Sequence, residues 1–232
     1  MDESKMLSKV LAEVQQFLPT LDPDPAHDFD HILEVLVHGQ KGYQTSSWHG
    51  KLTSDQEEDI WLAIALHEVD DHKLTSSEDY ENARRILRKC GWHDIDTVIE
   101  LIDLVSCSHN GNTPVPELWK LIPRAADRMA AIGIRGMERA FAYGKAKKRP
   151  MRVRSTPRFT TAEEIKAGAK YERFQAYVRS GGRSASTIDH VFDKLLHLNN
   201  PHLPEIDMSE YFREESIRLH KEMVDYLLNL RF

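Results

Sequence analysis

The sequence has few cysteines and no long apolar segment, and both absences limit the class of protein. Cys90 and Cys107 are the only cysteines among 232 residues, which is too few for a disulfide framework. No apolar segment approaches the roughly 20 residues that a membrane-spanning helix needs. Residues 1–5 also lack the basic-then-apolar order of a signal peptide. We therefore expect a soluble protein of the cytoplasm, with both cysteines present as buried thiols.

The chain also lacks an excess of positive charge, internal repeats and any break in composition. Its formal net charge is −6 at pH 7, so the total charge does not favour binding to nucleic acid or to a membrane surface. Hydrophobic residues make up 41% of the chain and charged residues 29%, which is typical of a globular protein with a buried core. A single domain is the expectation for a chain of this length.

Strand-like alternation of apolar and polar residues is absent as well, whereas apolar residues at helical spacing are frequent. The expected helices span about residues 5–18, 28–43, 54–67, 77–89, 94–107, 116–143, 162–178, 186–198 and 209–230. Asp28 is the expected N-cap of the second helix, and Ser54 with Glu57 forms the expected capping box of the third. Gly91 is the expected C-cap of the fourth. The sequence therefore predicts an all-α protein.

The stretch from His67 to Lys73 differs from the rest because it follows an apolar segment, residues 60–66, and is itself almost entirely polar. It presents His, Glu, two Asp, His and Lys within seven positions. One interpretation is a buried helix that opens onto a functional site. The other is a helix C-terminus that continues into a solvated loop.

Two further polar side chains lie in helices that are otherwise largely apolar. His31 is in the first turns of the second expected helix, and His27 lies four positions before it. A histidine on an apolar face is usually a core residue with a backbone hydrogen bond. Asp127 lies among alanines, and a buried carboxylate needs a partner, a metal ion or an altered protonation state. Together with His67 and Glu68, these residues suit a divalent metal such as Mn, Fe, Zn or Mg.

The order His31, His67-Glu68, Asp127 resembles the H…HD…D pattern of the HD superfamily of metal-dependent phosphohydrolases. Three further segments resemble a bacterial branch of small HD hydrolases. They are residues 27–31 (H-D-x-x-H), 127–133 (D-R-L-D/E-A-I/L-G) and 188–196 (H-F-Y-x-K-L-L). The resemblance covers about residues 25–230. It implies an all-α, HD-domain-like helical bundle with additional C-terminal helices. Some members of the branch are similar to nucleoside triphosphate pyrophosphohydrolases.

The resemblance also implies roles for individual residues. The implied ligands of one divalent metal ion are His31, His67, Glu68 and Asp127. Manganese is the favoured ion, with magnesium, iron, zinc, cobalt and nickel as alternatives. The implied catalytic residues, which orient the attacking water and contact phosphate, are Asp71 and Lys73. The implied substrate-binding residues are His27, His109, Arg128, His190 and Lys194.

Several of these roles have simpler alternatives. Asp71 could cap the following turn, Lys73 could be a solvated loop residue, and Arg128 could pair with a nearby acid. The chain also departs from the HD pattern at Glu68, because Glu replaces the Asp of the dyad and moves the carboxylate by about one carbon–carbon bond.

The implied single domain has four parts. They are an N-terminal helix (1–22), a metal-site helical core (23–143), a basic loop (144–160) and a C-terminal helical layer (161–232). The lysines and arginines between residues 145 and 158 indicate either a solvated linker or a flap that attracts a polyphosphate substrate.

The sequence leaves three functions open. The first is a metal-dependent phosphohydrolase acting on a nucleotide, with conversion of a nucleoside triphosphate to monophosphate and pyrophosphate favoured. The second is a di-iron HD-type oxygenase, suggested by His93 and His109. The third is a catalytically weak nucleotide-binding HD protein, suggested by Glu68 and by Ala125 and Ala130, which stand where relatives carry acids. We expect a small phosphorylated substrate as partner, and neither a membrane nor nucleic acid. A homodimer is left open.

Overall fold

The structure is a computed structural model that describes residues 5–21, 28–71, 74–200 and 202–230. Over these ranges it contains thirteen α-helices, three 3-10 helices and no strand, which confirms the all-α prediction. The first helices are α1 (Lys5–Phe17), α2 (Phe29–Gln44), α3 (Ser54–Leu66), α4 (Glu81–Cys90), α5 (Ile95–Val105), α6 (Cys107–Asn110) and α7 (Ile122–Ala131). The others are α8 (Gly133–Ala146), α9 (Ala162–Gly168), α10 (Tyr171–Arg179), α11 (Thr187–Asp193), α12 (Pro204–Asp207) and α13 (Glu210–Asn229). The 3-10 helices are η1 (Leu18–Thr20), η2 (Leu118–Leu121) and η3 (Leu195–His197).

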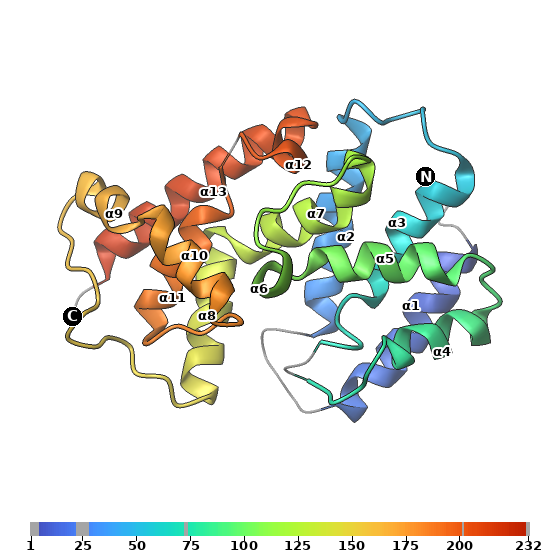
Figure 1. Cartoon of the computed structure of the whole chain (residues 1–232), viewed down its shortest axis with the longest axis horizontal. Helices are drawn as coiled ribbons and strands as arrows, with labels where there is room; N and C mark the ends of the chain where they lie inside the picture. The colour runs from blue at the N-terminus through green and yellow to red at the C-terminus, as the bar shows by residue number, and fades with distance from the viewer. Residues whose placement is uncertain (1–4, 22–27, 72–73, 201, 231–232) are drawn as a thin grey trace.

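Helix α7 lies at the centre of the molecule. In Figure 1, helices α1–α5 gather toward one end and α8–α11 toward the other, with α7 between them and α13 running from the second group toward α12. Helix α7 contacts α2, α3 and α5 on the first side and α8, α12 and α13 on the second. A polar residue on α7 can therefore meet partners from both halves of the chain.

The N-caps of α2 and α3 fix where these two helices begin. Asp28 caps α2 as predicted, because its carboxylate accepts a hydrogen bond of 2.9 Å from the backbone N–H of His31. The cap of α3 is Thr53, one residue before the predicted Ser54. Thr53 and Gln56 exchange hydrogen bonds between side chain and backbone and form the capping box. The cap of α2 thus also holds the backbone of a candidate metal ligand.

Two glycines with positive φ end helices. Gly91 has a φ of 86° and ends α4, as predicted. Gly133 has a φ of 75° and separates α7 from α8, where the sequence predicted one helix over residues 116–143. That prediction is wrong because Ile132 is extended, Gly133 is left-handed, and a Cβ on Gly133 would lie 2.5 Å from Leu219. The break directs α8 along α13, away from the core of the first half.

Three other helices are shorter than predicted because the backbone leaves the helical conformation at one residue. Tyr80 is left-handed with a φ of 56° before α4, Ser106 is extended after α5, and Lys194 follows the end of α11. All three residues line the cavity described below. These three positions thus lie around the candidate site, whereas the helix predicted over 162–178 is interrupted between α9 and α10, at residues that do not line the cavity.

Helix α3 is buried along most of its length and carries the candidate site at its end. Leu62, Ile64 and Leu66 have no exposed surface, and the helix packs against α1, α2, α5 and α7. Burying one such side chain stabilises the fold by about 1.5–3 kcal/mol. His67 and Glu68 therefore leave the helix from a fixed point in the core. None of the described helices has the length and apolar character needed to cross a bilayer.

Candidate metal centre

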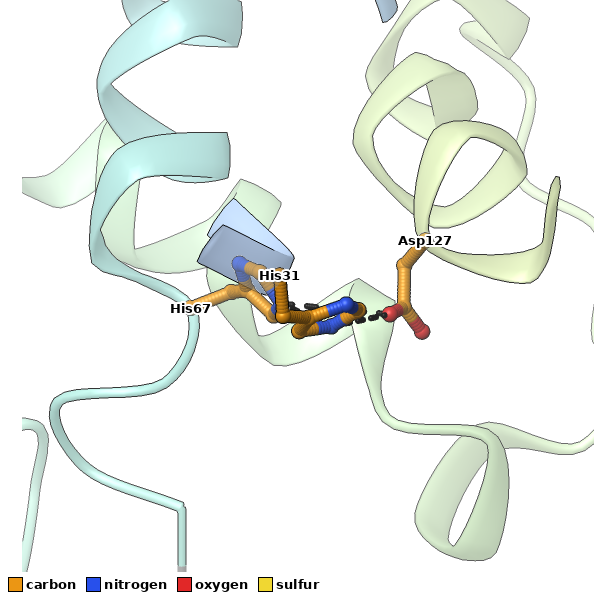
Figure 2. Close-up of side chains that lie close together, drawn as sticks. All are labelled: His31, His67 and Asp127. Atoms are coloured by element: carbon orange, nitrogen blue, oxygen red, sulfur yellow. Dashed lines mark hydrogen bonds and ion pairs between the residues drawn. The ribbon is translucent and has the colours of Figure 1, made fainter. Parts of the chain in front are cut away.

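Three ligand-type side chains from different parts of the chain converge at one point (Figure 2). His31 comes from the first turn of α2, His67 from the end of α3 and Asp127 from α7. The two Nε2 atoms of the histidines are 3.4 Å apart. The Oδ1 atom of Asp127 lies 3.3 Å from the first Nε2 and 3.8 Å from the second. The ligand atoms of this trio all lie within 4.8 Å of one another, which is close enough to share one ion.

Glu68 joins the trio through both histidines. Its Oε1 atom lies 3.2 Å from Nε2 of His31 and 3.2 Å from Nε2 of His67, and the residue is 3% exposed. The longer Glu side chain thus reaches the place that the Asp of the HD pattern is expected to occupy. All four predicted ligands are brought together, although their role as ligands stays a prediction.

The donor set fits a divalent cation. The Nδ1 atom of His67 lies 2.7 Å from the carbonyl oxygen of Ile64, which favours a proton on Nδ1 and a lone pair on Nε2. That lone pair points at Nε2 of His31 and at two carboxylates. Lone pairs and negative charges that face one another in a buried place are stabilised by a cation between them.

The electrostatics of the cluster also favour positive charge at its centre. Burial alone lowers the pKa of both histidines, but the carboxylates of Glu68 and Asp127 outweigh it and raise the pKa of His31, and that of His67 to about 9. Burial alone raises the pKa of the Asp127 carboxyl. The hydrogen bond with His31 and the positive charges of His67 and Lys194 hold it well below its usual range. The cluster therefore binds protons tightly at the place where a metal ion would compete with them.

The cluster forms part of the wall of a cavity of about 680 Å³. The acidic residues of the wall are Glu68, Asp70, Asp71, Asp79 and Asp127. The residues with permanently cationic side chains are Arg139, Arg149 and Lys194. The acids come from the loop after α3, from α7 and from the residues before α4, whereas the cations come from α8 and the segments after α8 and α11. A cavity with both kinds of charge suits an anionic ligand that also contacts a metal ion.

The adjacent residues Asp70 and Asp71 have different surroundings. The Asp70 carboxylate accepts hydrogen bonds from the backbone N–H groups of Asn82 (3.1 Å) and Ala83 (2.8 Å) and so holds the start of α4. Asp71 lines the cavity, and its backbone N–H donates to the Glu68 carbonyl at 3.2 Å. The capping alternative therefore applies to Asp70, while Asp71 lies on the cavity wall close in sequence to a predicted ligand.

Arg128 points away from the cavity, which corrects the prediction that it binds substrate. It is 1% exposed, and its Nη1 lies 2.8 Å from Oε1 of Glu205 while its Nη2 donates to the carbonyl of Gly111 at 2.5 Å. Arg124, one turn earlier on α7, contacts the same Glu205 oxygen at 3.1 Å. Neighbouring residues on a helix point about 100° apart, so Asp127 can face the histidines while Arg128 faces a different side of the helix.

The other described substrate-binding candidates all line the cavity. The side chain of His109 is 73% exposed and lies 3.8 Å from Oδ1 of Asp103. The ring of His190 meets the ring of Tyr177 edge to face, with 5.6 Å between the ring centres. Lys194 lines the cavity from the residue that follows α11. The structure therefore places these three where a substrate could touch them, and their roles stay predictions.

Two predicted residues, His27 and Lys73, lie outside the described residues. His93, which suggested the di-iron alternative, is not among the described residues that line the cavity. Its side chain is 67% exposed, lies 3.5 Å from Asp55, and packs against Trp92 with 4.8 Å between the ring centres. It therefore offers no second-metal ligand near the trio in this conformation.

Many residues of the cavity wall were not among the predicted site residues, and Tyr80, Arg139 and Arg149 are three of them. Tyr80 reaches the cavity from a left-handed backbone, and its hydroxyl donates to Oδ1 of Asp103 at 2.5 Å. Arg139 pairs with Glu34 at 2.8 Å. Arg149 lies in the basic stretch, whose positive charge was the only sequence signal for it. Nothing in the sequence marks Tyr80, because its position depends on a backbone conformation that tyrosine rarely adopts.

Comparison with known proteins adds a relative and a fold. No model of a known protein family matches the chain. The uncharacterized protein L803 of Acanthamoeba polyphaga mimivirus is 37% identical over 221 residues, which cover 89% of this chain and 88% of that protein. The crystal structure of Bacillus subtilis YpgQ in complex with ADP is similar with a TM-score of 0.59 and 20% identity, over 95% of this chain and 93% of that one. A Bacillus thuringiensis HD-superfamily hydrolase is similar with a TM-score of 0.57 and 22% identity, over 95% and 92% of the two chains. Because these identities are low, the two structures show the fold and nothing more.

Proposed function

The chain belongs to one family with the mimivirus protein L803 and has the HD-superfamily fold, and from this premise we propose that it is a metal-dependent phosphohydrolase. The favoured reaction is hydrolysis of a nucleotide, from nucleoside triphosphate to monophosphate and pyrophosphate. The observation that carries the proposal is the convergence of His31, His67, Glu68 and Asp127 on the wall of a cavity that also contains cations.

The chemistry divides between the metal ligands and the rest of the wall. A divalent ion bound by the four side chains would lower the pKa of its water and polarise a phosphoryl oxygen. Asp71 would align the attacking water and accept its proton. In the favoured reaction the water oxygen would form a bond to the α-phosphorus, the bond from that phosphorus to the bridging oxygen would break, and pyrophosphate would leave with the electron pair. Lys194 would stabilise the negative charge on the phosphoryl oxygens.

Three observations support a nucleotide as the substrate. The cavity volume of about 680 Å³ lies within the range of small-molecule sites. Tyr80, Tyr143 and Tyr177 contribute to its wall, and aromatic rings can stack on a base. YpgQ, which shares the fold, was crystallised with ADP. These observations favour a phosphorylated ligand that has a flat, apolar part.

The direct test is a hydrolysis assay on the purified chain. We expect release of pyrophosphate from at least one nucleoside triphosphate with manganese, and loss of release on addition of a chelator or in the variant His67→Ala. The panel should include nucleoside di- and monophosphates and simple phosphoesters, each with manganese, magnesium, iron, zinc, cobalt and nickel. Absence of phosphate and pyrophosphate release from every combination would refute the proposal.

A second variant tests the alternative of a weakened site. Glu68→Asp restores the residue of the HD pattern. Because Oε1 of Glu68 already contacts both histidines, we expect this change to shorten the reach of the carboxylate and to lower the hydrolysis rate. A large gain in rate would instead identify the protein as a catalytically weak relative.

A further inference from the structure

The basic segment, defined here as residues 147–158, contributes one side chain to the cavity. Most of its cations are exposed to solvent; these are Lys147, Lys148, Arg154 and Arg158. Arg149 is half-buried and is the member of the segment, among the described residues, that lines the cavity. The segment therefore has one cation with a position unlike that of the others.

The backbone around Arg149 is anchored on the helix that borders the cavity. The N–H of Arg149 donates to the carbonyl of Gly144 at 2.8 Å. The carbonyls of the next two residues accept hydrogen bonds from the N–H groups of Thr187 (2.9 Å) and Ile188 (3.1 Å), in the first turn of α11. Lys148, just before it, has a left-handed φ of 53°, a conformation that costs free energy in a residue other than glycine. The segment is thus held on α11 at this point, while most of its cations are solvated, as one of the two alternatives expected.

The side chain of Arg149 is oriented but lacks an anionic partner. Its guanidinium lies over the ring of Tyr143, 5.5 Å from the ring centre. Its Nη1 atom is buried, and no described residue accepts a hydrogen bond from it or forms an ion pair with the guanidinium. Arg139, on the same cavity wall, is different because Glu34 already neutralises it. A buried guanidinium donor without an acceptor is costly, and an anion in this part of the cavity would supply the acceptor that the described residues do not.

We propose that Arg149 binds a second anionic group of the substrate, apart from the phosphoryl group held at the metal cluster, and so selects substrates with more than one phosphoryl group. The proposal rests on the proposed function, because it takes the four-residue cluster as the first phosphoryl site. Lys194 and Arg149 reach the cavity from different segments, Lys194 from the residue that follows α11 and Arg149 from the segment that follows α8, where its guanidinium lies over Tyr143. An arginine suits this task because its planar fork pairs with two phosphoryl oxygens at once.

The test compares two ligands that differ by one anionic group, methylenediphosphonate and methylphosphonate. Both resist hydrolysis, and both are titrated into the full chain at one fixed excess of magnesium. We expect Arg149→Gln to weaken binding of the diphosphonate at least about tenfold, because a charge-assisted hydrogen bond is lost. The affinity for methylphosphonate should change by less than about twofold, since this ligand is held at the metal site of His31, His67, Glu68 and Asp127. Arg149→Lys keeps the charge without the fork, and we expect an intermediate loss for the diphosphonate.

The matched control is Arg154→Gln, which removes the same charge from the same segment at an exposed position. It should leave both affinities at the level of the unchanged chain. The inference is overturned if Arg149→Gln behaves like Arg154→Gln, if it weakens both ligands equally, or if the unchanged chain does not prefer the diphosphonate. The thermal midpoint of each variant shows whether it is folded, and Arg149→Lys decides the question if Arg149→Gln is not. The binding result holds whether or not the chain hydrolyses any nucleotide, so failure of the proposed function is seen separately.

Discussion

Helix α7 carries buried charges on two faces, and the two groups are neutralised in different ways. On one face, Asp127 meets two histidines and borders the cavity, with 21% of its side chain exposed. On the other, Arg124 and Arg128 share the carboxylate of Glu205, and all three side chains are at most 1% exposed. The second group lies on the side of α7 where α12 packs.

The difference shows how to tell a structural charge cluster from a functional one. The arginine face contains both signs of charge, so the protein supplies its own counter-ions, together with carbonyls such as that of Gly111. The Asp127 face brings together acceptors and acids. Burial has the largest influence on the pKa of His67 and lowers it, but the carboxylate of Glu68 beside the ring helps to raise this pKa to about 9. A cluster that attracts protons so strongly is suited to hold a metal ion.

The largest expected effect is that of Asp127→Asn on hydrolysis. The change removes one ligand charge from the metal site, and we expect the rate to fall at least about a hundredfold, because even outer-sphere partners of metal ligands are worth 10–100-fold. The thermal midpoint of the metal-free protein should fall, because the two histidines lose a charged partner, and it shows whether the variant is folded. A variant that hydrolyses at the original rate would show that Asp127 is no ligand.

Glu205→Ala should have the largest effect on stability. Removing this carboxylate leaves Arg124 and Arg128 buried without a counter-charge, and we expect a loss of about 3–5 kcal/mol in the free energy of unfolding. Chemical denaturation measures the loss, and the activity of the molecules that stay folded should be nearly unchanged. If Glu205→Ala folds as stably as the unchanged chain but loses metal binding, the two faces of α7 have been assigned the wrong way round.

Arg128→Met sharpens the comparison between the two faces of α7, because Arg128 is the neighbour of Asp127 in the sequence. We expect a loss of about 1–3 kcal/mol in the free energy of unfolding, because the buried Glu205 carboxylate and the Gly111 carbonyl each lose a hydrogen-bond donor. The KM for the substrate should stay within about twofold, because the guanidinium faces away from the cavity. A rise in KM without a loss of stability would restore Arg128 as a substrate-binding residue.

Metal affinity should depend on pH in the direction set by the histidines. The pKa of His67 is raised to about 9 from its usual 6.5, so the stability that its charge contributes is complete below pH 6.5 and is lost as pH rises toward 9. A metal ion displaces this proton, so manganese affinity should rise over the same interval by up to about tenfold per pH unit. Titrations at several pH values measure the slope, and an affinity that does not rise with pH would contradict the assignment.

The smallest expected effect is that of His109→Ala. This histidine is 73% exposed, and the ion-pair partner nearest its ring, Asp103, is 3.8 Å away. We expect the KM to rise by less than about threefold and the stability to stay within about 0.5 kcal/mol. A loss of activity as large as that of Asp127→Asn would mean that His109 binds a second metal ion, as the di-iron alternative requires.

The sequence predicted the all-α class from local signals, and it predicted the meeting of four ligand-type residues from the resemblance of their order to the HD pattern. Helical spacing and caps such as Asp28 are visible in short windows, and the order of His31, His67-Glu68 and Asp127 is a motif. The sequence did not predict the break at Gly133, because the same residue is tolerated within helices and only the approach of Leu219 shows why it is needed here.

The errors at the site come from contacts between distant parts of the chain. Arg128 follows a predicted ligand directly, yet its partner, Glu205, lies in α12, and no local pattern links the two. Arg149 could not be told from the other cations of the basic segment, because the backbone beside it is held by hydrogen bonds from Thr187 and Ile188, which are distant in the sequence. The motifs therefore located the four ligand-type residues, whereas the other residues of the cavity wall could be identified only from the tertiary structure.

The most direct measurement is a calorimetric titration of manganese into the metal-free chain, alongside Asp127→Asn and Arg128→Met. These two variants alter neighbouring residues of one helix that face different groups of charges. The chain and Arg128→Met should each bind one ion with affinities within about threefold of each other, and Asp127→Asn should bind at least about a hundredfold more weakly. Equal binding by Asp127→Asn and the unchanged chain, or loss of binding in Arg128→Met while it is folded, would contradict the placing of the metal centre on the Asp127 face.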